Sequence, residues 1–596
     1  MSNHLNTSDA VDPTARNRRK KWLATGIAGL TGVVSLGLVA ATNAGAVSRV
    51  DDLGGQQSQR DGSGQNGREG DGDQVLNVTN VPCDVNELFA AINRANQHLG
   101  GTLKLARGCT YELRNGTATT GPSTGSNALP PITTDITILG EHSSLERAFD
   151  LPSAAPALFR IFQVSPGGNL RLSDTTLRNG LVTGGDDGGA ILVQAGARAE
   201  LNGVKLTQNN AAGGGGVGGA IANLGTTVLK DSSLTLNNAG GSGGAVSNTG
   251  TLTVEKTYFE ANKTSSIAPN GGGAVASTGG TVQVRESTFV GNQTAGSGGG
   301  LQLTAGSGSV TDTTFRLNIA TFNGGGIGNT GADLQLRNVK FVQNTAILSG
   351  GGLFTSPGTT TTVLRGDAAL PTDLVERAEH ERSEAGKDER KDDERDAGKD
   401  ERKVDERESG KGSTAEKSGE RKSDKDSSAE KSEKADGRGA GDGGERHDAA
   451  KGDQREGGKS HTGRHDGTTD EQEGARQDDK GSELEKRVEE HKGTTFFGNV
   501  AGFLGGGIAN NGILTLADAV LLRNQAAVSG GGINNITPGT VVIQHSVITE
   551  NQAGVNGGGI FNAAPAGNVT VDTRSRVFKN NPNNCFPLGA TANCQG

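Results

Sequence analysis

The amino-acid sequence predicts an all-β fold: a parallel β-helix, or solenoid, of about 12 coils with an N-terminal capping helix and a long disordered insertion. Glycine accounts for 97 of the 596 residues, whereas aromatic residues make up only 3%. Because each glycine inside a helix costs roughly 1 kcal/mol, this composition disfavours helical repeats. The strongest indication is the recurrence of two landmarks at a common period of about 26 residues.

The first landmark is a glycine pair followed by a small residue and an aliphatic residue. It recurs ten times, at spacings of 25 to 30 residues with one spacing of 155. Between the landmarks lie short alternating runs such as Thr251–Val254, a pattern typical of half-buried strands. A repeat of this length with three such strands forms one coil, which buries its aliphatic residues on its neighbours. The landmark aliphatic residues are Ile191, Ile221, Val246, Val275, Leu301, Ile327, Leu353, Ile508, Ile533 and Ile560.

The second landmark is an aromatic residue with an asparagine three positions later, in phase with the first. The phenylalanines predict an internal aromatic column. The asparagines predict a ladder along the axis of the solenoid, in which each side-chain amide bonds to the amides of the neighbouring coils. The predicted ladder residues are Asn262, Asn292, Asn318, Asn344 and Asn499, which follow Phe259, Phe289, Phe315, Phe341 and Phe496.

A capping helix is predicted at the start of the solenoid, where an open strand edge would invite aggregation. Asp84 is a suitable N-cap residue, and Glu87 follows three positions later. The apolar residues that then share one helical face are Leu88, Ile92, Ala95 and Leu99.

Four cysteines predict two structural disulfides, since an even number suits an oxidising compartment. Cys83 and Cys109 are 26 residues apart, which is one repeat, and Cys585 and Cys594 are close enough to clip the C-terminal tail. Metal binding is the alternative, but neither pair has a histidine or another cysteine at ligand spacing. The sequence predicts no metal and no cofactor.

Residues 1–46 have the features of a secretion signal. A basic run, 16–21, precedes an uncharged, mainly apolar run, 22–46, which ends in small residues suited to cleavage before Val47. An uncleaved membrane anchor is the alternative. The pair Arg18-Arg19 resembles a twin-arginine signal, so the export route stays open between the two pathways. A disordered linker, 47–80, would follow, and the expected location is secreted or cell surface.

The spacing of 155 residues contains one coil and a charged insertion, 368–493. This segment separates the solenoid into a first part, 81–367, and a last part, 494–596. Its composition of Lys, Glu, Asp, Ser and Gly cannot bury enough surface to fold, so it is predicted to be disordered. It is either a tolerated surface loop or an electrostatic attachment to a charged wall or mucus layer. Its histidines, predicted to be solvated, are His380, His447, His461, His465 and His491.

The charge balance excludes a nucleic-acid partner. Residues 371–490 carry a net charge of −11, so the rest of the chain has a net charge of +2 and lacks the basic footprint that nucleic-acid binding needs. The tripeptide 365–367, Arg-Gly-Asp, lies at the mouth of the insertion, where an integrin ligand would be accessible, but so short a motif arises readily by chance.

The sequence shows no catalytic constellation. Carboxylates are sparse in the solenoid; the pairs Asp231/Glu255 and Glu260/Glu286 have spacings that would allow stacking on adjacent coils, although each also fits ordinary solvent-facing positions. The acidic pair 186–187 lies in a glycine-rich run that fits a turn better than a Ca²⁺ site. Besides the phenylalanines, only two tyrosines could serve as sugar-binding platforms, Tyr111 and Tyr258.

The repeats resemble those of chlamydial polymorphic outer membrane proteins, which are surface adhesins. The resemblance rests on Gly-Gly-Ala-Ile at 188–191 and 218–221, Gly-Gly-Ala-Val at 243–246 and 272–275, and Phe-x-x-Asn. The chlamydial proteins end in a membrane barrel that this sequence lacks, so their autotransport does not carry over.

The start of the solenoid is similar to the Cys-Ser-Leu-Arg-Glu-Ala motif that opens many secreted bacterial right-handed β-helix proteins. This likeness covers the segment 83–92, Gly101-Thr102-Leu103 and Tyr111, with a partial match in the first ten positions. The ending 580–585 with Cys594 resembles actinobacterial members of that group. Together the resemblances cover about 81–366 and 494–596, and they imply a right-handed solenoid and secretion.

The predicted function is a secreted or cell-surface, non-catalytic β-helix protein that is adhesin-like or structural. The alternative is a secreted polysaccharide lyase or glycoside hydrolase of the β-helix type. The expected partner is a cell-wall or extracellular polysaccharide or a host surface, with no nucleic acid and, after signal cleavage, no membrane.

Overall fold

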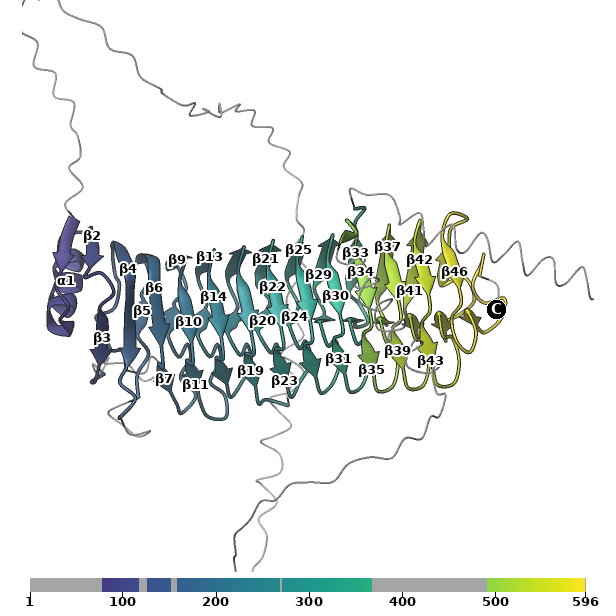
Figure 1. The fold of residues 1–596 in the computed structure, drawn as a ribbon, viewed down its shortest axis with the longest axis horizontal. Coiled ribbons are helices and arrows are strands. Elements are labelled where there is room, and N and C mark those ends of the chain that lie inside the picture. The colour runs from purple at the N-terminus through teal and green to yellow at the C-terminus, as the bar shows by residue number, and fades with distance from the viewer. Residues whose placement is uncertain (1–77, 117–125, 152–157, 268–270, 367–489, 595–596) are drawn as a thin grey trace, which may run out of the picture. The chain divides into compact units, whose positions relative to one another are not determined.

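The computed structural model shows a right-handed parallel β-helix with one helix at its N-terminal end (Figure 1). The predicted signal peptide, residues 47–77 of the predicted linker and residues 368–489 of the predicted insertion lie outside the described residues. The structure describes residues 78–116, 126–151, 158–267, 271–366 and 490–594.

A 12-stranded parallel sheet forms one wall of the solenoid. It contains the landmark aliphatic residues, which face inward and stack in register from coil to coil, as Ile191 does on Ile221 and Leu353 on Ile508. Its strands are β5 (Phe162–Val164), β8 (Ile191–Val193), β12 (Ile221–Asn223), β16 (Val246–Asn248), β20 (Val275–Thr278), β24 (Leu301–Thr304), β28 (Ile327–Thr330), β32 (Leu353–Thr355), β36 (Ile508–Asn510), β40 (Ile533–Asn535), β44 (Ile560–Asn562) and β47 (Cys585–Phe586).

A second wall is a 10-stranded sheet of two-residue strands. Each strand places a small residue such as Ala211 or Ala346 toward the interior. The strands are β7 (Leu181–Val182), β11 (Asn210–Ala211), β15 (Asn238–Ala239), β19 (Lys263–Thr264), β23 (Gln293–Thr294), β27 (Ile319–Ala320), β31 (Thr345–Ala346), β35 (Val500–Ala501), β39 (Gln525–Ala526) and β43 (Gln552–Ala553).

The third wall is a 25-stranded sheet in which a typical coil contributes two strands separated by a corner. A coil therefore has four strand segments, such as β16, β17, β18 and β19, rather than the three that the sequence predicted. The strands before the corner are β1 (Val78–Val81), β2 (Gly100–Leu105), β4 (Asp135–Arg147), β6 (Asn169–Arg178), β9 (Arg198–Asn202), β13 (Thr226–Lys230), β17 (Thr251–Glu255), β21 (Thr281–Arg285), β25 (Ser307–Thr311), β29 (Asp333–Arg337), β33 (Thr360–Val363), β37 (Ile513–Ala517), β41 (Thr540–Gln544) and β45 (Val569–Val571).

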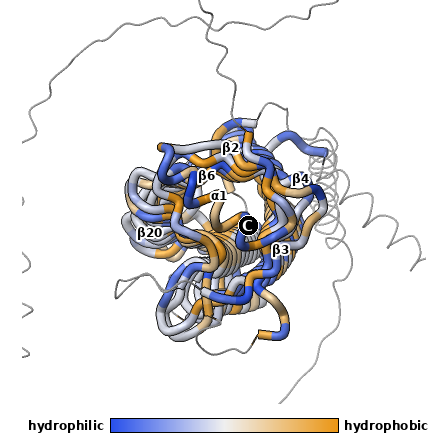
Figure 2. Tube along the Cα trace, turned by 90° about the vertical axis from the view of Figure 1, so that its left-hand side faces the viewer, coloured by the Kyte–Doolittle hydropathy of each residue, from blue (hydrophilic) through white to orange (hydrophobic). Residues whose placement is uncertain are grey.

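The strands after the corner carry the aromatic landmark in their second position; β4 and β6 are long enough to continue past the corner themselves. Viewed along the axis, the coils superimpose around one apolar interior (Figure 2). The remaining strands are β3 (Thr110–Leu113), β10 (Lys205–Thr207), β14 (Ser233–Thr235), β18 (Tyr258–Glu260), β22 (Thr288–Val290), β26 (Thr314–Arg316), β30 (Lys340–Val342), β34 (Thr495–Phe497), β38 (Val520–Leu522), β42 (Val547–Thr549) and β46 (Arg576–Phe578).

Helix α1 (Val85–Gln97) covers the first coil, as predicted. The Asp84 carboxylate caps it by accepting hydrogen bonds from the backbone N–H groups of Asn86 and Glu87. The prediction was wrong about Leu99, which lies beyond the helix at a positive φ and is 86% exposed. Ala91 joins the buried helical face instead. The predicted linker was too long, since its last three residues belong to β1 and pair with β2.

Both predicted disulfides are confirmed. Cys83 bonds to Cys109, which ties the start of the capping helix to the first coil, and Cys585 bonds to Cys594 at the other end. Tyr111 reinforces the first cap because it is fully buried, and its hydroxyl contacts the carbonyl oxygens of Val81 and Pro82. It therefore cannot be the exposed sugar platform considered from the sequence.

The coil that carries the insertion continues in register on the other side of it. Strand β33 pairs with β29, and β34 pairs with β30, so Phe496 stacks on Phe341 although 155 residues separate them. The chain departs after Gly366 and returns beside it, since a Cβ built on Gly366 would lie 2.4 Å from the carbonyl oxygen of Lys492. The insertion thus occupies one corner of the third wall.

Candidate functional site: a polar face on a rigid solenoid

The predicted aromatic column is present in the interior. Phe259, Phe289, Phe315, Phe341 and Phe496 are fully buried, and consecutive rings stack with centroids 4.5 to 5.4 Å apart. Such contacts add about 0.5–1.5 kcal/mol per pair beyond the burial of apolar area. The column makes five successive coils rigid.

The five predicted ladder asparagines lie directly beside this column and bond to one another. Asn318 is representative: its Nδ2 donates to Asn344 Oδ1 at 2.9 Å and to the carbonyl oxygen of Phe289, while its Oδ1 accepts from Nδ2 and the backbone N–H of Asn292. The same pattern crosses the insertion, where Asn344 Nδ2 donates to Asn499 Oδ1 at 3.0 Å. Every ladder amide is buried and satisfied.

Five further ladder members escaped the sequence analysis. The ladder starts at Asn209 and continues to Asn580, with Nδ2 to Oδ1 distances of 2.9 to 3.1 Å. These coils have an aliphatic residue in place of phenylalanine, so a search for aliphatic-x-x-Asn would have found them. The added members are Asn209, Asn237, Asn524, Asn551 and Asn580, which follow Leu206, Leu234, Leu521, Ile548 and Val577.

The outward residues of the strands before the corner form a continuous polar face. On β17, β21 and β25 this face contains a depression of about 380 Å³. Its polar lining consists of Thr253, Glu255, Gln283, Arg285, Ser309 and Thr311. Hydroxyl, amide, carboxylate and guanidinium groups thus lie side by side at the roughly 4.8 Å spacing of parallel strands. This combination suits hydrogen bonding to a polyhydroxylated or charged polymer.

Neither acidic pair considered from the sequence stacks. Glu255 lies between Lys230 and Arg285 in register, so opposite charges alternate along this row. Glu260 lies beside Thr235 and Val290 instead of Glu286. The 24- and 26-residue spacings failed because coils differ in length by several residues.

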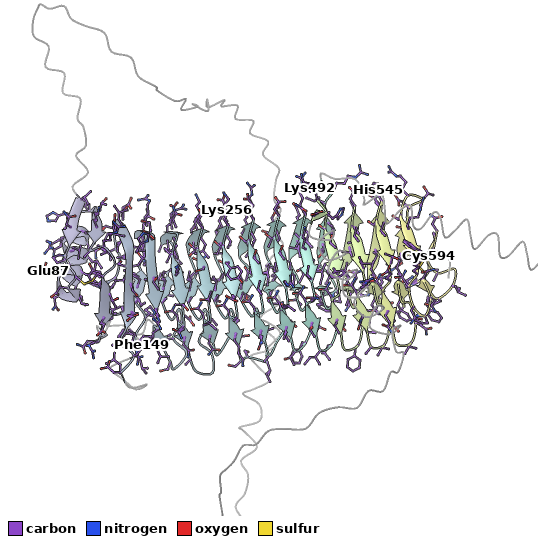
Figure 3. The ribbon with its side chains drawn as sticks, in the orientation of Figure 1. Glu87, Phe149, Lys256, Lys492, His545 and Cys594 are labelled. Carbon is purple, nitrogen blue, oxygen red and sulfur yellow. A yellow bond between two sulfur atoms is a disulfide. The ribbon has the colours of Figure 1, made fainter. Side chains whose placement is uncertain are left out.

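Most carboxylates occupy the corner of the third wall instead of a strand. Asp174, Asp231, Glu286, Asp312 and Asp518 all have φ near +50° there. Asp and Asn tolerate this left-handed conformation better than other non-glycine residues, which explains much of the enrichment. Cations share the same edge, where Lys256 contacts Glu286 at 4.0 Å, and Lys256, Lys492 and His545 follow that edge in Figure 3.

The corner next to the insertion contains the densest group of charges. The Asp518 side chain is buried, contacts Nδ1 of His545, and lies 3.4 Å from Nε of Arg365. Arg365 of the Arg-Gly-Asp tripeptide thus forms an ion pair, while Asp367 lies outside the described residues.

His491 corrects the prediction that the histidines of the insertion are solvated. It is 8% exposed, and its Nε2 has no hydrogen-bond partner among the described residues. Burial lowers its pKa, Lys340 lowers it further, and Asp518 opposes both effects. The residue escaped the sequence analysis because it follows a long charged segment directly. The other four histidines lie outside the described residues.

The glycine-rich acidic turn has a structural role. Asp187 Oδ1 accepts a hydrogen bond from the Val217 N–H, and the Asp187 carbonyl oxygen accepts one from Nε of Arg160. Burial raises the pKa of Asp187 and lowers that of Arg160 to about 10, while Asp186 and Asp187 support the charged guanidinium. These contacts place both groups in the wall of the solenoid.

Exposed aromatic residues lie elsewhere than predicted. Tyr258 is 38% exposed on β18, as the sequence allowed, but Phe503 is 53% exposed in a loop. Phe503 belongs to an apolar column in which each backbone N–H bonds to the preceding coil. The members of this column are Phe322, Leu348, Phe503, Val528 and Val555.

Two searches of the described residues were negative. No group of three or more His, Cys, Asp or Glu side chains there is arranged to hold a metal ion. In that same part of the chain no helix has the length and hydropathy needed to cross a bilayer.

Comparison with known proteins supports the architecture. A family model described as the right handed beta helix region matches residues 162–320, which extend from β5 to the end of β27. Comparisons with curated proteins and with solved structures gave no match. The repeat pattern, the register of the strands and this match agree, and the chain is a right-handed β-helix protein.

Proposed function

We propose that this protein is a secreted or cell-surface, non-catalytic binding rod that attaches to an extracellular or cell-wall polysaccharide through its polar face. The observation that carries the proposal is the depression over β17, β21 and β25, where six polar side chains line one rigid surface. Side chains on stacked strands are held in place by the ladder and the aromatic column behind them. A polymer that lies across several coils would meet the same chemistry repeatedly.

The charges of the face favour an acidic or neutral polymer over a strongly cationic one. Arg285 is exposed at the depression, and its cross-strand neighbour Glu255 is half-buried. A guanidinium group presents several donors in a fixed plane, which suits carboxylates and sugar hydroxyls. Export through the N-terminal signal would bring the protein to such polymers and to an oxidising compartment that suits two disulfides.

The test is binding of the mature chain to acidic and neutral polysaccharides and to bacterial cell walls, with polymer chain length followed in parallel. The double variant Gln283→Ala/Arg285→Ala should weaken binding at least about tenfold, equivalent to roughly 1.4 kcal/mol. The control Gln293→Ala changes an exposed residue of the 10-stranded sheet and should leave binding unchanged.

Two outcomes would contradict the proposal. Binding that survives the double variant would remove this face from the interaction. Shortening of the polymer by the wild-type chain would instead identify a polysaccharide lyase or glycoside hydrolase.

A further inference from the structure

The outer side of the strands after the corner changes character along the rod. Side chains alternate on these strands, so residues next to the inward Phe341, Phe496, Leu521 and Ile548 point outward. On the C-terminal coils these outward residues form a separate hydrophobic cluster, called here the outer apolar patch. It consists of Val342, Phe497, Val520, Leu522 and Val547, with Phe578 at its margin.

The outer apolar patch is covered. Its five members are no more than 7% exposed, although they stand on the outside of the solenoid. Thr288 and Val290 occupy the same two columns on an earlier coil and are only half-buried, and Tyr258 and Glu260 are exposed. Neighbouring strands alone therefore do not produce this burial, and another segment must lie over the patch.

Basic residues border the patch. In one column Lys340 and Arg576 lie at its two ends, and in the other Arg316 precedes Val342. An acidic occupant would be favoured there.

The chain itself supplies a matching segment at the right place. Residues 482–490 immediately precede the coil that contains Phe497, and four of them are glutamates. Leu484 and Val488 are spaced to share one face of a helix, and that face continues to His491 at the next turn. His491 is buried, and Lys340, at the border of the patch, affects its pKa. The apolar side chains would then point toward the solenoid.

We propose that the segment 482–490 packs as an amphipathic helix on the outer apolar patch, so that the end of the insertion is an integral part of the folded rod. From Leu484 to His491 a helix extends about 10 Å, which matches about two coils of the patch. Leu484 and Val488 contact the patch, and the glutamates face its basic border. The insertion is thereby held against one wall on its return side.

Cysteine labelling tests this packing in the full-length chain, where the four native cysteines are in disulfides. Thr495→Cys introduces a thiol at a fully buried outward site within the patch, and Thr288→Cys introduces one in the same column on an uncovered coil. We expect maleimide to label Thr495→Cys at least about tenfold more slowly than Thr288→Cys. Adding Leu484→Glu/Val488→Glu should abolish this difference, whereas Lys486→Glu, on the opposite helical face, should not.

The alternatives have distinct outcomes. Fast labelling of Thr495→Cys in the isolated protein would show an open patch awaiting an external partner, and would overturn the proposal. Slow labelling that depends on protein concentration would indicate a second copy, and slow labelling unaffected by Leu484→Glu/Val488→Glu would indicate another segment of the chain. Circular dichroism identifies variants that have lost the β-helix, and in that case Leu484→Ala/Val488→Ala, which adds no charge, replaces the glutamate pair.

Discussion

The early and late coils of the rod share one interior but differ outside. Asn237 and Asn524 occupy equivalent ladder positions and make equivalent bonds. One coil later, Tyr258 stands exposed in the column where Val520 is buried. The inward positions are dictated by the stacking of coils, whereas the outward positions are free to differ. Differences in function between coils therefore belong to the outward residues.

The largest expected effect concerns the shared interior. Asn318→Leu removes bonds to Asn292, Asn344 and Phe289 and leaves several buried groups unpaired. Each such group costs about 1–3 kcal/mol, so unfolding should become easier by at least about 3 kcal/mol. Denaturant unfolding measures this.

Asn524→Leu, on a late coil, should have an equal effect, since its bonds are the same. A loss below about 1 kcal/mol in either variant would mean that the ladder does not stabilise that region. Unequal losses would mean that the two regions do not share one interior after all.

The outer apolar patch should respond next most strongly. Val520→Asp buries a carboxylate without a partner and should cost about 2–4 kcal/mol. Tyr258→Asp, in the same column on an early coil, should change stability by less than about 0.5 kcal/mol. Thermal melting of both variants checks this contrast. Similar shifts in the two would remove the distinction between the covered and the open coils.

Acidification should destabilise the late coils through His491. Its pKa is lowered in the folded protein, so below a pH of about 6.5 the unfolded chain binds more protons than the folded chain. The stabilisation by neutral His491 is complete above that pH and is lost as the pH falls toward the lowered value, by at most about 1.4 kcal/mol per pH unit.

Melting of the wild type and His491→Gln at pH 7.5 and 5.5 isolates this effect. Asp518, Lys340, Arg365 and His545 are present in both proteins, so their titration contributes to both. The gap in stability between the two proteins should change with pH. A constant gap would show that His491 titrates equally in the folded and unfolded states.

The smallest expected effect concerns the polar face. Arg285→Glu places two carboxylates side by side on adjacent coils, because Glu255 is the cross-strand neighbour. Stability should fall by about 0.5–1 kcal/mol, and the loss should shrink in high salt. Urea unfolding at two salt concentrations measures it. An unchanged midpoint at low salt would show that the charges of this face are too solvated to interact.

The sequence predicted the interior far better than the surface, for a physical reason. Glycine pairs and buried asparagines recur because every coil must meet the same packing and hydrogen-bonding demands. The missed ladder members show the limit, since Leu206 and Val577 fill the interior as phenylalanine does elsewhere.

The candidate site was less predictable because it depends on register. Glu255 was placed opposite Asp231 by counting residues, yet it lies opposite Lys230 and Arg285. Turn lengths decide such pairings, and they vary from coil to coil. The outer apolar patch likewise becomes visible only when four strands are aligned.

The ladder makes the growing end of the solenoid a template. All its side-chain amides donate in the same direction, from each coil to the next, so a rod that ends at Asn344 has a donor waiting for Asn499. At about 5–20 residues per second, a ribosome needs roughly 8–30 s to synthesise the 155 residues between them. Folding there must pause at a half-built rod and resume on the same template when the next asparagine arrives.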